Sequence, residues 1–184
     1  MMIQRTVDLN PTPAALITHT IIRVQGEHAG DITVYSAVTP EARIRIEWGG
    51  LLMTMYSAQA CQGVLEGFAT ARSAMALIPP TIPAMSVDDR TEPFARTTVS
   101  IDWTRRPAYA VVPRQELSRN KAREVRWLDL HMGPVTFQIL DQAGCLSAAA
   151  LLRSAHHTAT NVCLDGPDFA DDPTLSGYTP PVGD

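Results

Sequence analysis

Two stretches of the chain, residues 47–74 and residues 129–155, show the same order of hydrophobic and polar positions. Each begins with an acidic residue and passes through a turn into a β-type run. Each then ends in a helix-like segment of small residues that closes on Arg-Ser-Ala. Internal similarity of this kind indicates a repeated supersecondary unit. The pattern therefore predicts a duplicated architecture.

In the first half, residues 42–48 alternate most clearly. Ile44, Ile46 and Trp48 lie on one face, and Arg43 and Arg45 lie on the other. A two-residue hairpin turn is expected at Gly49-Gly50. A helix is expected to follow over residues 58–77 and to stop at the prolines after Ile78. The predicted strands are residues 18–25, 31–38, 42–48 and 51–56.

The second half repeats this order. A hairpin turn is expected at Gly133-Pro134, and a helix over residues 142–157. Alternation places Trp103 inward and puts Trp127 on the same face as Val125, so both tryptophans are expected in the core. Leu128 would then share the opposite face with Glu124 and Arg126. The predicted strands are residues 97–103, 108–114, 122–130 and 135–140.

These elements predict an α+β fold of two β-β-β-β-α repeats, with antiparallel sheets packed with two helices. Either each sheet lies under a helix, or the two sheets pack on each other. Small residues in both helices, such as Gly63 and Gly67, are expected to allow close packing. The expected organisation is an N-terminal arm (1–16), a first repeat (17–78), a linker (79–93), a second repeat (94–163) and a disordered acidic tail (164–184).

The composition favours a soluble protein. Of 184 residues, 45% are hydrophobic, and no apolar run approaches the ~18 residues of a membrane helix. No signal peptide is recognised at the N-terminus. The odd number of cysteines (Cys61, Cys145 and Cys163) favours reduced thiols and a cytoplasmic location. We expect these thiols to be small core residues.

The formal net charge of −4 is unevenly distributed. Residues 164–184 contain five aspartates and no basic residue, whereas residues 104–127 contain seven basic residues against two acidic ones. Such a basic stretch can follow a phosphate backbone, and aromatic side chains among the arginines can stack on bases. The candidate nucleic-acid-binding residues are Arg43, Arg45, Arg105, Arg106, Tyr109, Arg114, Arg119, Lys121, Arg123 and Arg126.

The sequence carries no recognisable catalytic motif. The chain lacks a glycine-rich phosphate loop, a G-x-S-x-G turn and paired carboxylates at catalytic spacing. His156 and His157 are adjacent in sequence, so they do not share a helix face as metal ligands. The sequence therefore predicts neither an enzyme, nor a cofactor, nor a metal site.

A duplicated unit of four strands and a helix resembles the Whirly proteins and the Pur-repeat proteins, over about residues 17–157. The resemblance is one of topology. The Lys-Gly-Lys-Ala-Ala-Leu signature of plant Whirly proteins is absent, and its positional counterpart, residues 42–48, carries Arg43 and Arg45 instead. Because both families bind single-stranded nucleic acid, the resemblance implies that activity. It also implies a homo-oligomer.

The sequence thus favours a protein that binds single-stranded DNA or RNA without sequence preference. The alternative is a protein-interaction module that uses the same sheets to oligomerise and to bind a protein partner, which the pI of 5.7 favours. A third is a small enzyme with a pocket between the sheets. The acidic tail is expected either to compete with nucleic acid, or to recruit a partner through Phe169 and Tyr178, or to keep the chain soluble.

Overall fold

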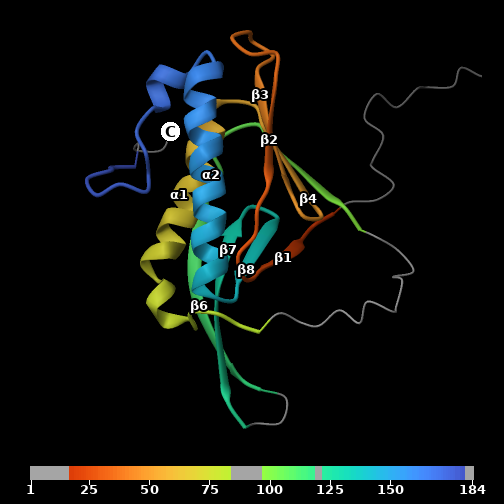
Figure 1. Ribbon diagram of the computed structural model, residues 1–184, viewed down its shortest axis with the longest axis vertical. Helices are drawn as coiled ribbons and strands as arrows, with labels where there is room; N and C mark the ends of the chain where they lie inside the picture. Colours follow the sequence, from red (N-terminus) through yellow and green to blue (C-terminus); the bar gives the residue numbers. More distant parts are fainter. Residues whose placement is uncertain (1–16, 84–96, 119–121, 181–184) are drawn as a thin grey trace, which may run out of the picture.

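The computed structural model describes residues 17–83, 97–118 and 122–180 (Figure 1). The predicted N-terminal segment (residues 1–16) and residues 84–93 of the predicted linker lie outside these residues. The strands described are β1 (Thr20–Val24), β2 (Asp31–Tyr35), β3 (Arg43–Trp48), β4 (Leu51–Met55), β5 (Val99–Trp103), β6 (Tyr109–Leu117), β7 (Glu124–Met132) and β8 (Val135–Ile139). The helices are α1 (Ala58–Ser73) and α2 (Gln142–Val162), with short 3₁₀ turns η1 (Met75–Leu77) and η2 (Gly166–Phe169).

The strands form two four-stranded sheets, in the orders β2-β3-β4-β5 and β1-β8-β7-β6. Neighbouring strands are antiparallel except in two pairs, β4 with β5 and β1 with β8, which are parallel. The predicted α+β class, with two largely antiparallel sheets packed with two helices, is confirmed.

The first strand of each repeat lies in the sheet of the other repeat, which the sequence did not indicate. Local hairpins predicted neighbours along the chain, but β1 pairs with β8 and β5 pairs with β4. After β1 the chain turns at Gly26, which has a φ of +68° and whose N–H is bound by Asp141. This turn leads β2 away to the second sheet. Each sheet therefore contains three strands of one repeat and one strand of the other.

Both predicted hairpin turns are confirmed. Trp48 pairs with Leu51 across Gly49-Gly50, and Met132 pairs with Val135 across Gly133-Pro134. Gly49 has a φ of +59° and Gly133 a φ of +56°, in the left-handed region that glycine adopts without strain. The two turns therefore fix equivalent registers in the two repeats.

The helices cover one face of both sheets (Figure 1). α1 packs on β4, β6 and β7, whereas α2 packs on β1, β3 and β8, and the two helices contact each other. Phe68 of α1 meets Phe137 of β8 edge-on, with ring centroids 5.2 Å apart. At Gly67 an added Cβ would collide with the Met132 side chain, so the predicted close packing of small helical residues is confirmed here. None of the helices described is both long and apolar enough to span a membrane.

Carboxylates and a hydroxyl cap both long helices. The Ser57 Oγ accepts a hydrogen bond from Ala60 N at the start of α1, and Asp141 Oδ1 accepts one from Gly144 N at the start of α2. Asp165 adds two bonds to α1, from Ala58 N at 2.9 Å and from Gln59 N at 3.0 Å. Backbone donors of a first helical turn have no partner within the helix, so these oxygens satisfy them.

The prediction of a disordered tail is wrong for residues 164–180. This segment forms η2 and packs against both helices. Asp172 binds Arg153 of α2, with its Oδ2 2.5 Å from the Arg153 Nε. Its acidic composition suggested disorder, but Asp165 and Asp172 instead bind helix amides and an arginine. The segment is therefore part of the folded structure.

Candidate nucleic-acid interface

The hairpin β6–β7 continues beyond the rest of its sheet (Figure 1). β6 and β7 pair along their whole length, whereas β8 pairs with β7 only from Leu128 to Met132. Residues 113–118 and 122–127 therefore form a two-stranded extension, here called the arm. From Arg114 to Arg126 the sequence has five basic residues and two acidic ones. The described residues of the arm include Arg114, Arg123 and Arg126 against Glu116 and Glu124, so the arm is basic.

Arg114 and Trp127 lie directly opposite each other on the arm. The Nε of Arg114 donates to Asp129 Oδ2 at 3.0 Å, and the Nε1 of Trp127 donates to Asp129 Oδ1 at 2.9 Å. The Asp129 side chain is nearly buried, whereas half of the Arg114 side chain is exposed. A single fixed carboxylate therefore holds a cation and an aromatic ring side by side.

This arrangement has the chemistry that a nucleic-acid strand requires. Arg114 binds Asp129 through its Nε, and neither terminal nitrogen of its guanidinium has a hydrogen bond to a described residue. These nitrogens can form a bidentate contact with a phosphate. The half-buried Trp127 offers a stacking surface. Asp129 was missed in the sequence, although the i, i+2 spacing of Trp127 and Asp129 on a strand is a signal that could have found it.

The expectation that Trp127 lies in the core is wrong. Leu128, Leu130 and Met132 are fully buried, and Leu130 and Met132 lie against Gly67 of α1. Trp127 alternates with them and so lies on the face of the sheet that the helices do not cover. The predicted inward position of Trp103 is confirmed, since it is buried in the core.

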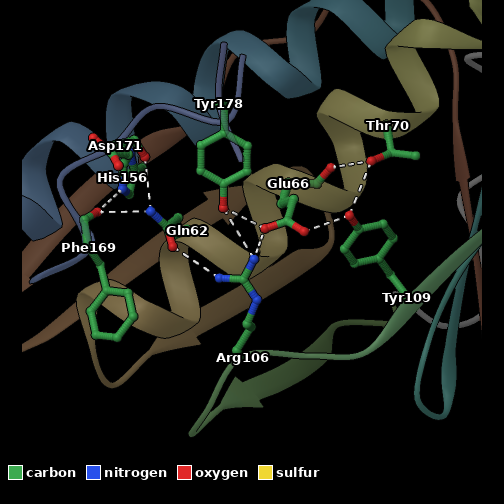
Figure 2. A network of polar contacts seen from close by, with 9 residues as sticks. All are labelled: Gln62, Glu66, Thr70, Arg106, Tyr109, His156, Phe169, Asp171 and Tyr178. Atoms are coloured by element: carbon green, nitrogen blue, oxygen red, sulfur yellow. Dashed lines mark hydrogen bonds and ion pairs between the residues drawn. The ribbon is translucent and has the colours of Figure 1, made fainter. Parts of the chain in front are cut away.

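Two predicted nucleic-acid contacts, Arg106 and Tyr109, instead contact the buried carboxylate of Glu66, a residue of α1 (Figure 2). Arg106 forms an ion pair with Glu66, and the Tyr109 hydroxyl donates to Glu66 Oε1 at 2.6 Å. Tyr178 of the C-terminal segment donates to Glu66 Oε2 at 2.7 Å, and burial raises the pKa of this tyrosine. Because Arg106 and Tyr109 face the helix and are occupied there, neither belongs to the interface.

The same network holds the C-terminal segment through Gln62 (Figure 2). The Gln62 Oε1 accepts from Arg106 Nη1 at 3.0 Å, and its Nε2 donates to the carbonyl oxygens of Phe169 and Asp171. His156 Nε2 lies 2.8 Å from the same Phe169 oxygen. Each oxygen of the buried Glu66 carboxylate therefore has a hydrogen-bond partner, as a stable buried ion pair requires.

Arg43 and Arg45 lie on the uncovered face of the other sheet. The guanidinium of Arg43 is 5.9 Å from the centre of the Tyr56 ring. Arg45 Nη1 donates to the Tyr35 hydroxyl at 3.5 Å, and this hydrogen bond raises the pKa of Arg45. The strand register places three acidic residues on this face as well: Asp31, Glu47 and Asp102. Its mixed charge makes it a weaker phosphate track than the arm.

The other candidates are dispersed. Arg105 is exposed between β5 and β6, where it lines a hollow of about 590 Å³. Arg123 is exposed at the start of the arm's second strand, and Arg126 Nη2 lies 3.0 Å from Glu124 Oε2. Arg119 and Lys121 lie outside the described residues. Of the sequence candidates, the structure brings Arg114, Arg123 and Arg126 together on the arm.

Ser147 and His28 are in contact but do not form a catalytic pair. The Ser147 Oγ lies 3.1 Å from both ring nitrogens of His28, so it is not aligned with the lone pair of either. His28 Nδ1 is 2.9 Å from the Gly26 carbonyl, and Asp141 binds backbone amides rather than His28. This is not the geometry of an activated nucleophile.

The cysteines are not placed as nucleophiles or as metal ligands. All three cysteines are buried, and burial raises the pKa of both Cys145 and Cys163 to about 11. Their thiols are therefore protonated and poor nucleophiles at neutral pH. Among the described residues, no group of three or more His, Cys, Asp or Glu side chains is placed to hold a metal ion.

No protein-family model, no curated protein and no solved structure matches this chain.

Proposed function

We propose that this chain binds single-stranded DNA or RNA without sequence preference, and that the arm is its binding surface. The observation that carries the proposal is the pair Arg114 and Trp127, both held by Asp129 on an exposed and basic hairpin. Phosphate contacts supply affinity without sequence readout. Stacking on an indole ring tolerates any base.

The experiment is a titration of a fluorescein-labelled poly-dT oligonucleotide by anisotropy at several salt concentrations. Arg114→Ala weakens binding and reduces the slope of log K against log salt by about 0.7, the value for one phosphate contact on a single strand. Trp127→Ala weakens binding roughly 5- to 150-fold, which corresponds to ~1–3 kcal/mol of stacking. Other oligonucleotide sequences respond alike.

Arg72→Ala is the matched control. Arg72 is an exposed arginine on α1, on the helical side of the molecule. Its removal changes the net charge by the same amount as Arg114→Ala, so a general charge effect would weaken both variants equally. Absence of binding by the wild type at low salt would refute the function. Equal weakening by the two arginine variants would refute the arm as the site.

A further inference from the structure

The arm has an unpaired strand edge. β8 ends at the pairing of Ile139 with Leu128, so among the described residues β7 has no strand neighbour on that side over residues 124–127. Residues 78–83 pass nearby, but in the described part of the chain their backbone hydrogen bonds go to elements other than β7. Pro79 O and Pro80 O, for example, accept from Gln142 N and Ala143 N at the start of α2. An open edge of this kind can accept another strand.

The register identifies which backbone groups point outward. Ser118 N donates to Arg123 O at 2.7 Å, which makes these two residues a hydrogen-bonded pair of the hairpin. In an antiparallel ladder such pairs alternate with pairs whose N–H and C=O groups point away from each other. Glu124 and Arg126 fall at the second kind of position. Pro113 of β6, which pairs with Leu128, also occupies a position whose N–H would point away from the partner strand. The missing N–H of proline is therefore not required there.

A groove of about 440 Å³ runs along this edge. One wall is residues 76–83, including the half-exposed Leu77, and the other is residues 123–126. The residues that line it are mainly aliphatic or proline, with Arg123, Arg126 and Glu124 at β7. It has an apolar wall, outward backbone groups and a net positive charge. None of its lining residues is aromatic, so it offers no stacking surface for a base.

We infer that this groove binds an extended acidic peptide segment of a protein partner, which adds a strand to β7 at Glu124 and Arg126. Backbone pairing supplies affinity in this mode of recognition, and alternate side chains give specificity. Arg126 lies on one face of β7, and Arg123 and Val125 lie on the other. Acidic side chains of the peptide therefore reach an arginine on either face, while its apolar side chains contact Leu77 or Val125 in the groove. Charges flanking an open edge oppose pairing with unsuitable strands, so they select for the acidic partner. The inference does not depend on nucleic-acid binding.

The test measures binding of a fluorescein-labelled hexapeptide of alternating valine and aspartate by anisotropy. It should bind the full chain, whereas the same peptide with alternate amides N-methylated, or with lysine in place of aspartate, should bind at least tenfold more weakly. Leu77→Glu should weaken binding of the valine–aspartate peptide at least tenfold. Leu175→Glu should leave it unchanged, because Leu175 is a similarly exposed leucine (57% against 49%) in the C-terminal segment.

A second variant keeps the test informative if Leu77→Glu disturbs the fold. Arg123→Glu, at an exposed position, should reverse the preference toward the valine–lysine peptide. The inference is overturned if the valine–aspartate peptide does not bind, or if N-methylation has no effect. It is also overturned if poly-dT displaces the peptide and Leu77→Glu weakens both ligands equally, because the groove would then be a nucleic-acid site.

Discussion

Arg114 and Trp127, opposite each other across β6 and β7, share the carboxylate of Asp129 as hydrogen-bond acceptor. The two side chains on which the proposed function depends are therefore positioned by a third, which is nearly buried. Asp129 does not need to touch the nucleic acid. Its negative charge lies close to the proposed phosphate contact, so its electrostatic effect and its positioning effect on binding have opposite signs.

This opposition makes Asp129→Asn a sharp test. Loss of a negative charge alone would strengthen oligonucleotide binding. We expect weaker binding instead, by about threefold or more, because Arg114 and Trp127 donate to different oxygens of Asp129, and in asparagine an NH₂ group would face one of these donors. Trp127 should also become more accessible to acrylamide, measured by quenching of its fluorescence. The control is Glu116→Gln, an exposed acidic residue of the arm, which should strengthen binding slightly. If both variants strengthen binding, Asp129 does not position the site.

A second prediction concerns Asp141, which joins three parts of the chain. Its carboxylate is fully buried and accepts from Gly26 N, from Ile82 N at 3.0 Å and from Gly144 N at 2.8 Å. Asp141→Ala should lower the free energy of unfolding by about 3 kcal/mol or more, because each buried donor left unpaired costs ~1–3 kcal/mol. Urea denaturation measures this difference.

Ser57→Ala serves as the comparison, because Ser57 is the corresponding cap of α1 and accepts a single backbone bond, from Ala60 N. It should cost about 1 kcal/mol, the usual effect of an N-cap. Similar losses for the two variants would show that the bonds from Asp141 to Gly26 and Ile82 contribute little to stability.

Local chemistry explains what the sequence predicted well. Each hairpin turn is determined by two adjacent residues, so Gly49-Gly50 and Gly133-Pro134 could be recognised without any knowledge of the fold. The pairing of β1 with β8 is different. Its partners, such as Thr20 and Val135, are far apart in the chain, and no local pattern distinguishes β8 from β2 as the neighbour of β1. The exchange of strands between the repeats could therefore be recognised only from the structure.

The position of Trp127 outside the core could not be predicted for a related reason. Alternation divides β7 into two faces, but it does not say which face the helices cover. Arg126 and Leu128 lie on the same face of β7, but Arg126 is exposed and Leu128 is buried. The strand begins in the arm, where no helix covers it, and ends under α1. Asp165 is similar: its bonds to α1 join residues more than one hundred positions apart. Composition alone therefore suggested a free tail.

A third prediction concerns the C-terminal segment. The Tyr178 hydroxyl donates to Glu66 Oε2 at 2.7 Å and accepts from Arg106 Nη2 at 3.2 Å. Tyr178→Phe removes two hydrogen bonds to charged groups in a partly buried site, so it should lower the unfolding free energy by ~1–3 kcal/mol. Tyr35→Phe is the control, because Tyr35 is exposed and has only a long bond with Arg45, and its effect should stay within ~0.5 kcal/mol.

Glu66→Ala extends the same test. It leaves the partly buried Arg106 without its ion-pair partner. Removing one partner of a buried pair costs ~3–5 kcal/mol, and the remaining exposure of Arg106 favours the lower end of that range. Equal stability of Tyr178→Phe, Glu66→Ala and wild type would mean that the network does not hold the segment in place.

The last prediction concerns pH and His28. This ring stacks on Trp48 with centroids 4.4 Å apart, and burial lowers its pKa below the ordinary 6.5. A group whose pKa is lower in the folded state binds protons preferentially when unfolded. Stability that is present above pH 6.5 is therefore lost as the pH falls through the folded pKa. Urea denaturation at pH 7.5 and pH 5 should show a larger loss for wild type than for His28→Phe, which keeps a stacking ring but cannot titrate.

The comparison between these two pH values cancels the direct cost of the substitution, since His28→Phe also loses the hydrogen bond to the Gly26 carbonyl at both. His157→Gln is the matched control, because His157 is an exposed histidine on α2. It should retain the pH dependence of wild type. If His28→Phe loses as much stability as wild type between pH 7.5 and pH 5, the acid sensitivity arises elsewhere. The stacked and partly buried His28 would then titrate alike in the folded and unfolded chains, contrary to the effect expected from its burial.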